Sequence, residues 1–549
     1  MSAPGAATMV QLAGLASNRG RNLRNLHRLA PGGAELGVVL TNVADAPVLD
    51  WADDVGVSTE VVVRADDEPR REHEERVVEA LSGYDVDLVC LDGYMRLLSS
   101  TFLDAMPTTL NVHPSLLPSF PGMDAWGDAL AAGVAVTGCT VHVVTNAIDP
   151  DGGVVEEAID AGPIVTQEPV PVVAGDDRDS LKDRVLYTGE FKAYPRAVGW
   201  FAEGAVEVDL EANRVAVSAD VGGSFPARRL ASDDKVHELR YGENPHQAAA
   251  VYADASVTEA TVVGADQLNP NAKALSYNNY NDADAALALV REFARPAAAV
   301  IKHANPAGCA VSTDVADAYD RALRTDAMSA FGGIVALNRP CDAATAEQVV
   351  ESFKEVVVAP AFDDDALTVL RGKEGLRVLD VGPLGDPDDR SPGMAEKPLL
   401  GGRLVQDRDD QRLAVDDLEV VTEREPSDEQ LETMTFAWPV VKHVTSNAIV
   451  LATGTETVGV GMGQVSRVDA VRLAALKADE HAEGKSAAGA VMASDAFFPF
   501  PDAVELGIEA GVEAVVQPGG SVNDDAVIAA CNEHDVAMAF TGHRAFKHD

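Results

Sequence analysis

Two polar side chains stand close together in the stretch LNVHPSLLPSFPG, from Leu110 to Gly122. Asn111 and His113 are two residues apart, so in a β-strand both side chains point to the same face. A histidine can transfer a proton near neutral pH, and an asparagine can donate a hydrogen bond to an oxygen that gains negative charge during acyl transfer. Asp160, before a Gly-Pro turn, can orient His113 or accept a proton from it or from a bound water. These residues indicate a site suited to acyl transfer.

A second polar pair follows an apolar segment in AAVIKHANPAGCA, from Ala298 to Ala310. We expect Lys302 and His303 to lie just past the end of a strand and before an Asn-Pro-Ala-Gly turn, because adjacent residues within a strand would face opposite sides. A lysine beside a histidine can act as a proton-transfer pair. A dense polar group, LRYGENPHQ, opens the same half of the chain, and a solvated turn explains it equally well.

A glycine-containing turn lies near the start of the chain, in LASNRGRNLRNL from Leu15 to Leu26. A helix is predicted to begin near Asn22, and the free backbone amides of a helix start bind phosphate. Arg21 would add a positive charge. Such a turn can also be a simple strand-to-helix connection, so it indicates a phosphate site only together with the other polar residues of the first half.

Short apolar runs alternate with segments of helical period throughout the chain, which predicts an α/β fold with a mostly parallel sheet in the first half. Residues 71–84 are expected to form a surface helix with its acidic side chains outward. After a predicted hairpin near residue 206, a stretch rich in Gly, Pro, Ser and charge marks a junction at 229–235, between domains 1–228 and 236–549. The second domain is expected to contain two α/β subdomains, and we find no repeat with a period of 20 to 50 residues.

The chain is strongly acidic, with 88 Asp and Glu against 43 Lys and Arg and a formal net charge of −45 in 549 residues. Such a surface repels nucleic-acid phosphate, so nucleic acid is not an expected partner. The acid is spread over both halves, which favours a solvated surface adapted to high salt.

The five cysteines are odd in number and far apart, without CxxC or Cys/His spacing. They predict neither a disulfide framework nor a metal site, and they fit a reducing cytoplasm. No signal-like segment and no run of eighteen apolar residues occurs, so no membrane association is expected.

The first half resembles glycinamide ribonucleotide (GAR) formyltransferase over residues 9–228, through SNRGRN, GYMRLLS, LNVHPSLLP, TVHVV, IDAGPI and EFKAYP in the order of that family. The resemblance implies a Rossmann-like fold, 10-formyltetrahydrofolate as formyl donor, and catalysis by Asn111, His113 and Asp160. It further implies the remaining roles: the substrate phosphate at Gly20, Arg21 and Asn22, folate at Met95, Arg96, Leu97 and Leu98, and Glu190 near the substrate amine.

Two features depart from that family. An acidic insertion, NAIDPDGGVVEEA, precedes IDAGPI, so Asp149 or Asp151 competes with Asp160 for the catalytic role. We favour Asp160 because it keeps the GPI turn. Ser119 stands where a basic residue is common. The HPSLLP-type motif is shared with methionyl-tRNA formyltransferase and formyltetrahydrofolate hydrolase, but the phosphate turn and the acidic surface point away from both.

The second half, from residue 236 to 549, resembles the transformylase domain of the bifunctional AICAR transformylase/IMP cyclohydrolase, which has a cytidine-deaminase-like fold. The shared motifs include YGENPHQ, SYNNYNDADAAL, SAFGGIVALN, LLGGRLVQDRD, GMGQVSRVDAVRLA, SDAFFPFPD and TGHRAFKH. The resemblance implies a homodimer through this half. In that family a cyclohydrolase domain precedes the transformylase, but here the first formyltransferase-like domain occupies its place, so no ring-closing activity is expected. Neither mechanism is expected to need a metal, and no ligand cluster suggests one. The resemblance also implies three sets of residues: Lys302, His303 and Asn447 in catalysis, Arg240 and Arg544 on the substrate phosphate, and Tyr241, Gly332, Glu355, Arg467 and Phe497 in the pocket.

The sequence therefore predicts a fusion of two formyltransferases of purine (IMP) biosynthesis that act on small ribonucleotides. Two alternatives stay open. In one, only the second half is active and the first is a folate-binding or structural module. In the other, the chain is a salt-adapted binding protein, which leaves the Asn/His and Lys/His pairs unexplained.

Overall fold

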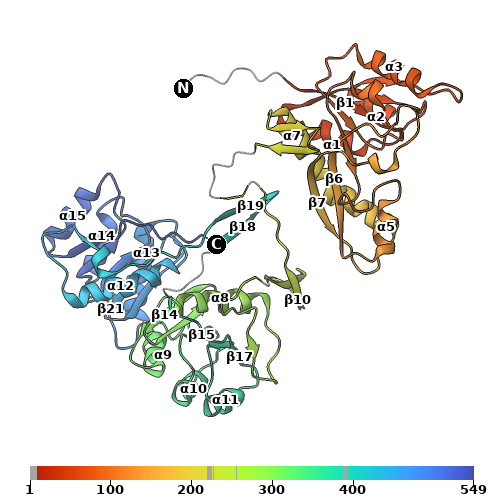
Figure 1. The fold of residues 1–549 in the computed structure, drawn as a ribbon. Helices are drawn as coiled ribbons and strands as arrows, with labels where there is room; N and C mark the ends of the chain where they lie inside the picture. Colours follow the sequence, from red (N-terminus) through yellow and green to blue (C-terminus); the bar gives the residue numbers. More distant parts are fainter. Residues whose placement is uncertain (1–8, 219–224, 227, 255, 388–392, 549) are drawn as a thin grey trace. The chain divides into compact units, whose positions relative to one another are not determined.

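The chain forms two compact units, residues 1–230 and 231–549, and the computed structural model describes residues 9–218, 225–226, 228–254, 256–387 and 393–548 (Figure 1). The predicted junction, residues 229–235, lies among these described residues, and the boundary between the two units falls between Leu230 and Ala231. Both units mix helices with sheets, so the predicted α/β class is confirmed.

The first unit is built on a seven-stranded sheet of order β3-β2-β1-β4-β5-β6-β7. The strands from β3 to β5 pair in parallel, and β6 and β7 add antiparallel strands at one edge. Its strands are β1 (Gln11–Leu15), β2 (Glu35–Thr41), β3 (Ser58–Val61), β4 (Leu88–Leu91), β5 (Thr109–His113), β6 (Val136–Val143) and β7 (Ile164–Pro171), with a separate hairpin of β8 (Val206–Asp209) and β9 (Arg214–Val217).

Helices cover both faces of this sheet because its strands alternate their buried side chains between two cores. Leu12 of β1 belongs to the core that includes Leu23 and Tyr194, whereas its neighbour Ala13 belongs to the core with Val77. The helical elements are α1 (Arg21–Leu29), η1 (Pro31–Gly33), α2 (Val48–Val55), α3 (Arg70–Leu81), α4 (Ser100–Leu103), α5 (Ala125–Ala132), η2 (Glu156–Ala158), α6 (Arg178–Arg184), η3 (Val185–Glu190) and α7 (Phe191–Ala202).

The order of the strands reverses between β1 and β4. The chain runs from β1 outward to β3 and returns on the other side of β1 as β4. In open α/β sheets, ligands bind at the carboxyl ends of the strands where the order reverses in this way. The turn after β1 and the segment after β4 therefore face one crevice.

Helix α3 corrects one prediction. Its acidic side chains were all expected outward, but Glu74 is 2% exposed. Its carboxylate accepts a hydrogen bond from the Ser99 amide at 3.0 Å, and a second from the Ser99 hydroxyl, at the start of α4. A buried carboxylate that caps a neighbouring helix does not show in the helical period.

The second unit has a twelve-stranded sheet that consists of two similar halves. Outward from the centre, one half reads β14, β13, β15, β16, β17, β12 and the other reads β22, β21, β23, β24, β25, β20. Each half begins with a helix and an antiparallel hairpin and continues with three parallel strands. The first hairpin starts at Ala297 and the second at Ile449, so the repeat is much longer than the periods searched in the sequence.

The elements of this unit follow in chain order. Its strands are β10 (Asp234–Leu239), β11 (Ala249–Ala253), β12 (Asp266–Gln267), β13 (Ala297–Lys302), β14 (Asn305–Val311), β15 (Ile334–Leu337), β16 (Val356–Ala359), β17 (Arg377–Asp380), β18 (Met394–Leu399), β19 (Gly402–Asp407), β20 (Glu419–Val420), β21 (Ile449–Thr453), β22 (Glu456–Gly461), β23 (Val491–Ser494), β24 (Ala514–Gln517) and β25 (Ala537–Phe540). Its helices are α8 (Tyr277–Val290), α9 (Val315–Leu323), α10 (Ala343–Val350), α11 (Asp364–Arg371), η5 (Val415–Asp417), α12 (Asp428–Lys442), α13 (Arg467–Glu480), α14 (Asp502–Glu509) and α15 (Asp524–Glu533).

Candidate functional sites

The first unit contains a cavity of about 990 Å³ at the carboxyl ends of β1, β4 and β5. Asn111 and His113 both line it, because their positions in β5 place their side chains on one face. His142 of β6 pairs in register with Asn111 and lines the same wall. Asp160, from the loop before β7, completes the group. The structure thus brings together the three residues predicted for acyl transfer.

His113 is held between two acceptors. Its Nε2 lies 2.9 Å from the carbonyl oxygen of Phe120, and its Nδ1 lies 3.1 Å from Oδ2 of Asp160. A carbonyl oxygen and an ionised carboxylate are both hydrogen-bond acceptors, so each ring nitrogen of His113 faces an acceptor. These two contacts fix the orientation of the imidazole ring.

Asp160 is the acid that contacts this histidine. Burial by itself would raise the pKa of Asp160, but its contact with His142 and the charges of His113 and His142 outweigh burial and lower the pKa below its ordinary value. Asp149, one of the competing acids, instead accepts the amides of Asp151 and Gly153 at 2.9 and 2.7 Å within its own loop. The insertion forms a self-contained turn, and Asp160 stays beside His113.

His142 is a site residue that sequence reasoning missed. It is 2% exposed, and its Nε2 lies 3.2 Å from Nδ2 of Asn111 and 3.6 Å from Oδ1 of Asp160. It stands within the quoted motif TVHVV, where alternation along β6 could have placed it on the inner face. It connects the asparagine to the acid across two strands.

Two residues of the predicted phosphate turn, Arg21 and Asn22, line the same cavity. Gly20 caps α1 in a left-handed conformation, with φ of 57°, which glycine adopts readily. In the described part of the chain, the amides of Gly20 and Arg21 form no hydrogen bond, whereas the amide of Asn22 is occupied by Asp92. Glu190 accepts from Nδ2 of Asn22 at 2.6 Å. Burial raises the pKa of Glu190 to about 7.

The segment predicted to contact folate also lines this cavity. Met95, Arg96, Leu97 and Leu98 all contribute to its wall. The Met95 amide donates to the Ser17 hydroxyl at 2.8 Å, which joins this segment to the turn after β1. Met95 is 55% exposed whereas Leu98 is buried, so the segment presents apolar surface to the opening.

In the second unit, Lys302 and His303 lie at a tight hairpin turn between β13 and β14. His303 and Ala304 both have positive φ values, 52° and 58°, as a two-residue hairpin turn of this type requires. The Asp282 carboxylate accepts their two amides at 3.1 and 2.9 Å. The expected Asn-Pro-Ala-Gly turn is wrong, because these residues form the start of β14. Lys302 donates to the Phe331 carbonyl at 2.8 Å, and His303 is exposed.

Asn447 lies near this hairpin. Oδ1 of Asn305 accepts the Thr445 amide at 2.9 Å, which ties the hairpin to the segment before β21. Asn447 itself accepts from Arg467 at 2.8 Å. Arg467 is 8% exposed and also forms an ion pair with Asp495. Arg467 therefore fixes the side chain of Asn447 through this hydrogen bond.

The remaining predicted residues of the second site are more exposed. Arg240 stacks over Tyr241 with 4.6 Å to the ring centroid, and Arg544 stacks in the same way over Phe546. Glu355 accepts from Asn279 of α8 at 2.7 Å. Gly332, with φ of 72°, and Phe497, which is 39% exposed, lie at the ends of strands. The Ser446 amide donates to the carbonyl of Lys547, so the segment of Arg544 reaches the region of Asn447.

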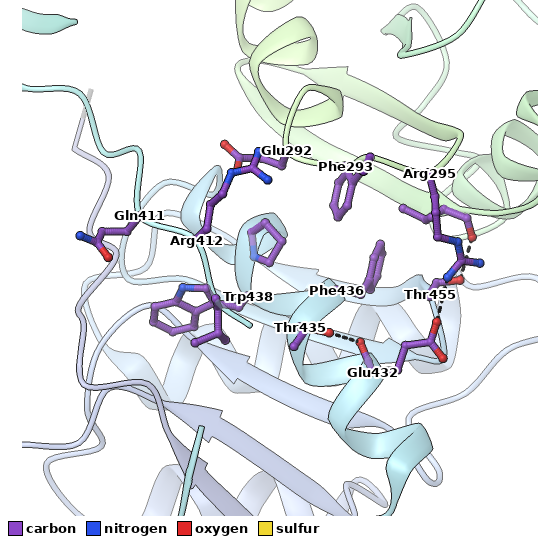
Figure 2. A pocket seen from close by; sticks show the side chains of 14 residues that line it. Glu292, Phe293, Arg295, Gln411, Arg412, Glu432, Thr435, Phe436, Trp438 and Thr455 are labelled. Atoms are coloured by element: carbon purple, nitrogen blue, oxygen red, sulfur yellow. Dashed lines mark hydrogen bonds and ion pairs between the residues drawn. The ribbon is translucent and has the colours of Figure 1, made fainter. Parts of the chain in front are cut away.

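A different cavity of about 300 Å³ lies in this unit and contains none of these residues (Figure 2). Phe293 and Phe436 stack at its centre with ring centroids 5.6 Å apart, and Arg295 pairs with Glu432 at 2.8 Å beside them. Phe293 and Arg295 precede β13, whereas Lys302 ends it, so about 17 Å of strand separates this cavity from Lys302.

Neither a group that could hold a metal ion nor a helix that could cross a membrane occurs among the described residues. No group of three or more His, Cys, Asp and Glu side chains among them is arranged to hold a metal ion. Within the same residues, no helix combines the length and apolar character that crossing a bilayer demands.

Comparison with known proteins identifies both halves. Residues 10–198 match the formyl transferase family, and residues 207–477 match the family described as AICARFT/IMPCHase bienzyme. Among solved structures, the chain is similar to glycinamide ribonucleotide transformylase 1 from Symbiobacterium toebii, with 37% identity over 39% of this chain and 99% of that one and a TM-score of 0.35. Phosphoribosylglycinamide formyltransferase from Anaplasma phagocytophilum gives 34% identity over 39% and 96%, with a TM-score of 0.34.

The protein is a formyltransferase enzyme. Its first half belongs to the formyl transferase family and its second half to the AICARFT/IMPCHase family, so the predicted fusion is confirmed.

Proposed function

We propose that the first unit transfers a formyl group from 10-formyltetrahydrofolate to the amine of glycinamide ribonucleotide. The contact of His113 with Asp160 beside Asn111, inside a cavity that reaches the start of α1, carries this proposal. The substrate amine attacks the formyl carbon, and Asn111 with protonated His113 stabilises the oxyanion. Asp160 then supports transfer of a proton from the amine to the departing folate nitrogen, whose bond to the formyl carbon breaks.

The other residues of the cavity position the two substrates. The phosphate lies at Gly20, Arg21 and Asn22, where, among the described residues, the amides of Gly20 and Arg21 are free to bind it, since free amides at a helix start favour an anion. Residues 95–98 contact the folate, and Glu190 lies near the substrate amine. The product tetrahydrofolate is common to both units.

For the second unit we propose formyl transfer from the same donor to the amine of aminoimidazole carboxamide ribonucleotide. Lys302 and His303 move the proton of this weakly nucleophilic amine, and Asn447 lies close to the formyl group. Arg240 and Arg544 bind the phosphate, a role suited to planar guanidinium groups. Tyr241, Gly332, Glu355 and Phe497 complete the pocket, and Arg467 acts through Asn447, which it contacts.

Two further parts of the proposal concern activity and assembly. We propose no ring-closing (IMP cyclohydrolase) activity, because the residues before 231 form the formyltransferase unit. We also propose a homodimer through the second unit, because His303, Phe497 and Arg544 are exposed within one chain. Neither proposed reaction requires a metal.

The five cysteines are buried and form no disulfide, which supports the proposal that the protein acts in a reducing cytoplasm.

The decisive experiment measures formyl transfer to each amine separately in high-salt buffer, with wild type, His113→Ala and Lys302→Ala. Each substitution should lower one reaction by about a thousandfold and spare the other. The same assay follows ring closure of the formylated product, and dilution with sedimentation follows the dimer. If wild type formylates only the aminoimidazole substrate, the first unit has another role.

A further inference from the structure

Asp92 occupies the helix start at which the first site would hold a phosphate. It follows β4, and its Oδ2 accepts the amides of Asn22 and Leu23 at 2.8 and 3.3 Å. Helix α1 has no side-chain cap of its own, because its cap residue is Gly20. Asp92 thus satisfies two of the four amides that a helix start leaves free. Its side chain also lines the cavity.

This arrangement limits where a phosphate can sit. A phosphate that used the amides of Asn22 and Leu23 would have to displace a carboxylate or lie beside it, and like charges at this distance repel. Burial raises the pKa of Asp92, while its hydrogen bonds from Asn22 and Leu23 oppose that shift. The amides of Gly20 and Arg21, which directly precede Asn22 and Leu23, are the helix-start donors that remain free to bind a phosphate.

The same carboxylate fixes the side chain of Asn22. Nδ2 of Asn22 lies 3.2 Å from Oδ1 of Asp92 and 2.6 Å from Oε2 of Glu190. In the structure both carboxyl groups accept from the NH₂ group of Asn22, so its Oδ1 faces away from them. Asn22 is 2% exposed, lines the cavity, and its Oδ1 has no hydrogen-bond partner among the described residues. A buried acceptor without a partner is unfavourable until a ligand supplies a donor.

We propose that Asp92 is a positioning residue of the first site: it keeps the substrate phosphate at Gly20 and Arg21, and with Glu190 it turns Oδ1 of Asn22 toward an N–H or O–H group of the bound substrate. The proposal rests on the function proposed above, because it assumes a phosphorylated substrate in this cavity. Removal of Asp92 frees the inner amides, so an anion binds more tightly but in a misplaced position.

The test uses the full-length protein and inorganic phosphate as probe. Asp92→Ala should bind phosphate about tenfold more tightly by calorimetry, and kcat for glycinamide ribonucleotide should fall about tenfold. Asp92→Asn keeps the size of the side chain and one acceptor oxygen but removes the charge, so it should change both quantities in the same directions by a smaller factor. Asp177→Ala is the matched control, because Asp177 caps α6 through the Ser180 amide at 2.8 Å. This control should change neither quantity.

The outcomes separate the two proposals. An unchanged or weaker phosphate affinity in Asp92→Ala, with an active wild type, overturns the positioning role and leaves the proposed function intact. A tighter affinity with no formyl transfer by wild type shows that Asp92 limits anion binding at this helix start, but it removes the proposed function and with it the positioning of that substrate. A loss of stability alone, equal to that of Asp177→Ala, shows that Asp92 only caps the helix and likewise overturns the inference.

Discussion

The two proposed sites differ in how far one chain completes them. In the first unit, His113 is 4% exposed and touches Asp160, and the surrounding cavity encloses about 990 Å³. In the second unit, His303 is exposed on a two-residue turn, and the arginines assigned to the phosphate stack on neighbouring rings at the surface. The first proposed site is therefore preorganised by one sheet, whereas one chain leaves the residues of the second proposed site exposed.

The origin of the difference lies in the elements that carry the residues. Strands β5 and β6 hold Asn111, His113 and His142 in a fixed register, so backbone hydrogen bonds set their geometry. The second site lies at the end of a hairpin in one repeat and near the first strand of the other repeat. A site at such ends depends on turns, caps and covering segments, and these are easier to disturb.

The largest expected effect tests the first site. Asp160→Asn should lower kcat/KM for glycinamide ribonucleotide by about a thousandfold, because a neutral amide no longer balances the imidazolium of His113. The reaction of the second unit in the same sample should not change. Asp149→Asn serves as control, since Asp149 bonds within its own loop. Near-normal activity of Asp160→Asn would mean that the first unit is a binding module or that another acid acts.

The sequence predicted residues that stand in local patterns, and it missed residues whose roles depend on contacts between distant segments. Asn111 and His113 were found because two-residue spacing is a local pattern, and Asp160 because it keeps a recognisable turn. His142 and Asp92 were missed, since their roles depend on the pairing of β5 with β6 and on a strand end that meets a helix start. Such contacts between distant segments leave no local period.

The second unit shows the limits most clearly. The turn was expected at Asn305, where Asn-Pro and Gly favour turns, but it lies at His303 and Ala304, which rarely adopt positive φ values. Asp282, 21 residues earlier in α8, compensates by accepting both amides. The duplication was missed because its halves share an order of elements at a long spacing, not a short sequence period.

A smaller effect concerns pH and the buried acid of the first site. The pKa of Glu190 is raised to about 7 from its ordinary value of 4.5, so the folded state holds a proton that the unfolded state releases between these values. Stability of the first unit therefore falls as pH rises from about 5 to 7 and then levels off. Glu190→Gln removes this dependence, so the variant should gain on the order of 2 to 3 kcal/mol relative to wild type between pH 5 and 8. Urea unfolding of both proteins at pH 5 and pH 8 measures this difference in the free energy of unfolding. The same change with pH in wild type and Glu190→Gln would refute the prediction.

The smallest expected effect tests whether the second site depends on its turn. Asp282→Ala removes the acceptor of the His303 and Ala304 amides, so Lys302 and His303 should lose their fixed position and kcat for the aminoimidazole substrate should fall about tenfold. Asp282→Asn keeps an acceptor oxygen and should restore most of the rate.

Formylation of glycinamide ribonucleotide in the same samples is the internal reference and should stay constant. Equal second-site rates for Asp282→Ala and wild type would show that the pairing of β13 with β14 holds the turn by itself. Backbone pairing would then position the proposed catalytic residues in both units. The two sites would differ only in how exposed their side chains are within one chain, and a second chain in the proposed homodimer would cover the exposed residues of the second site.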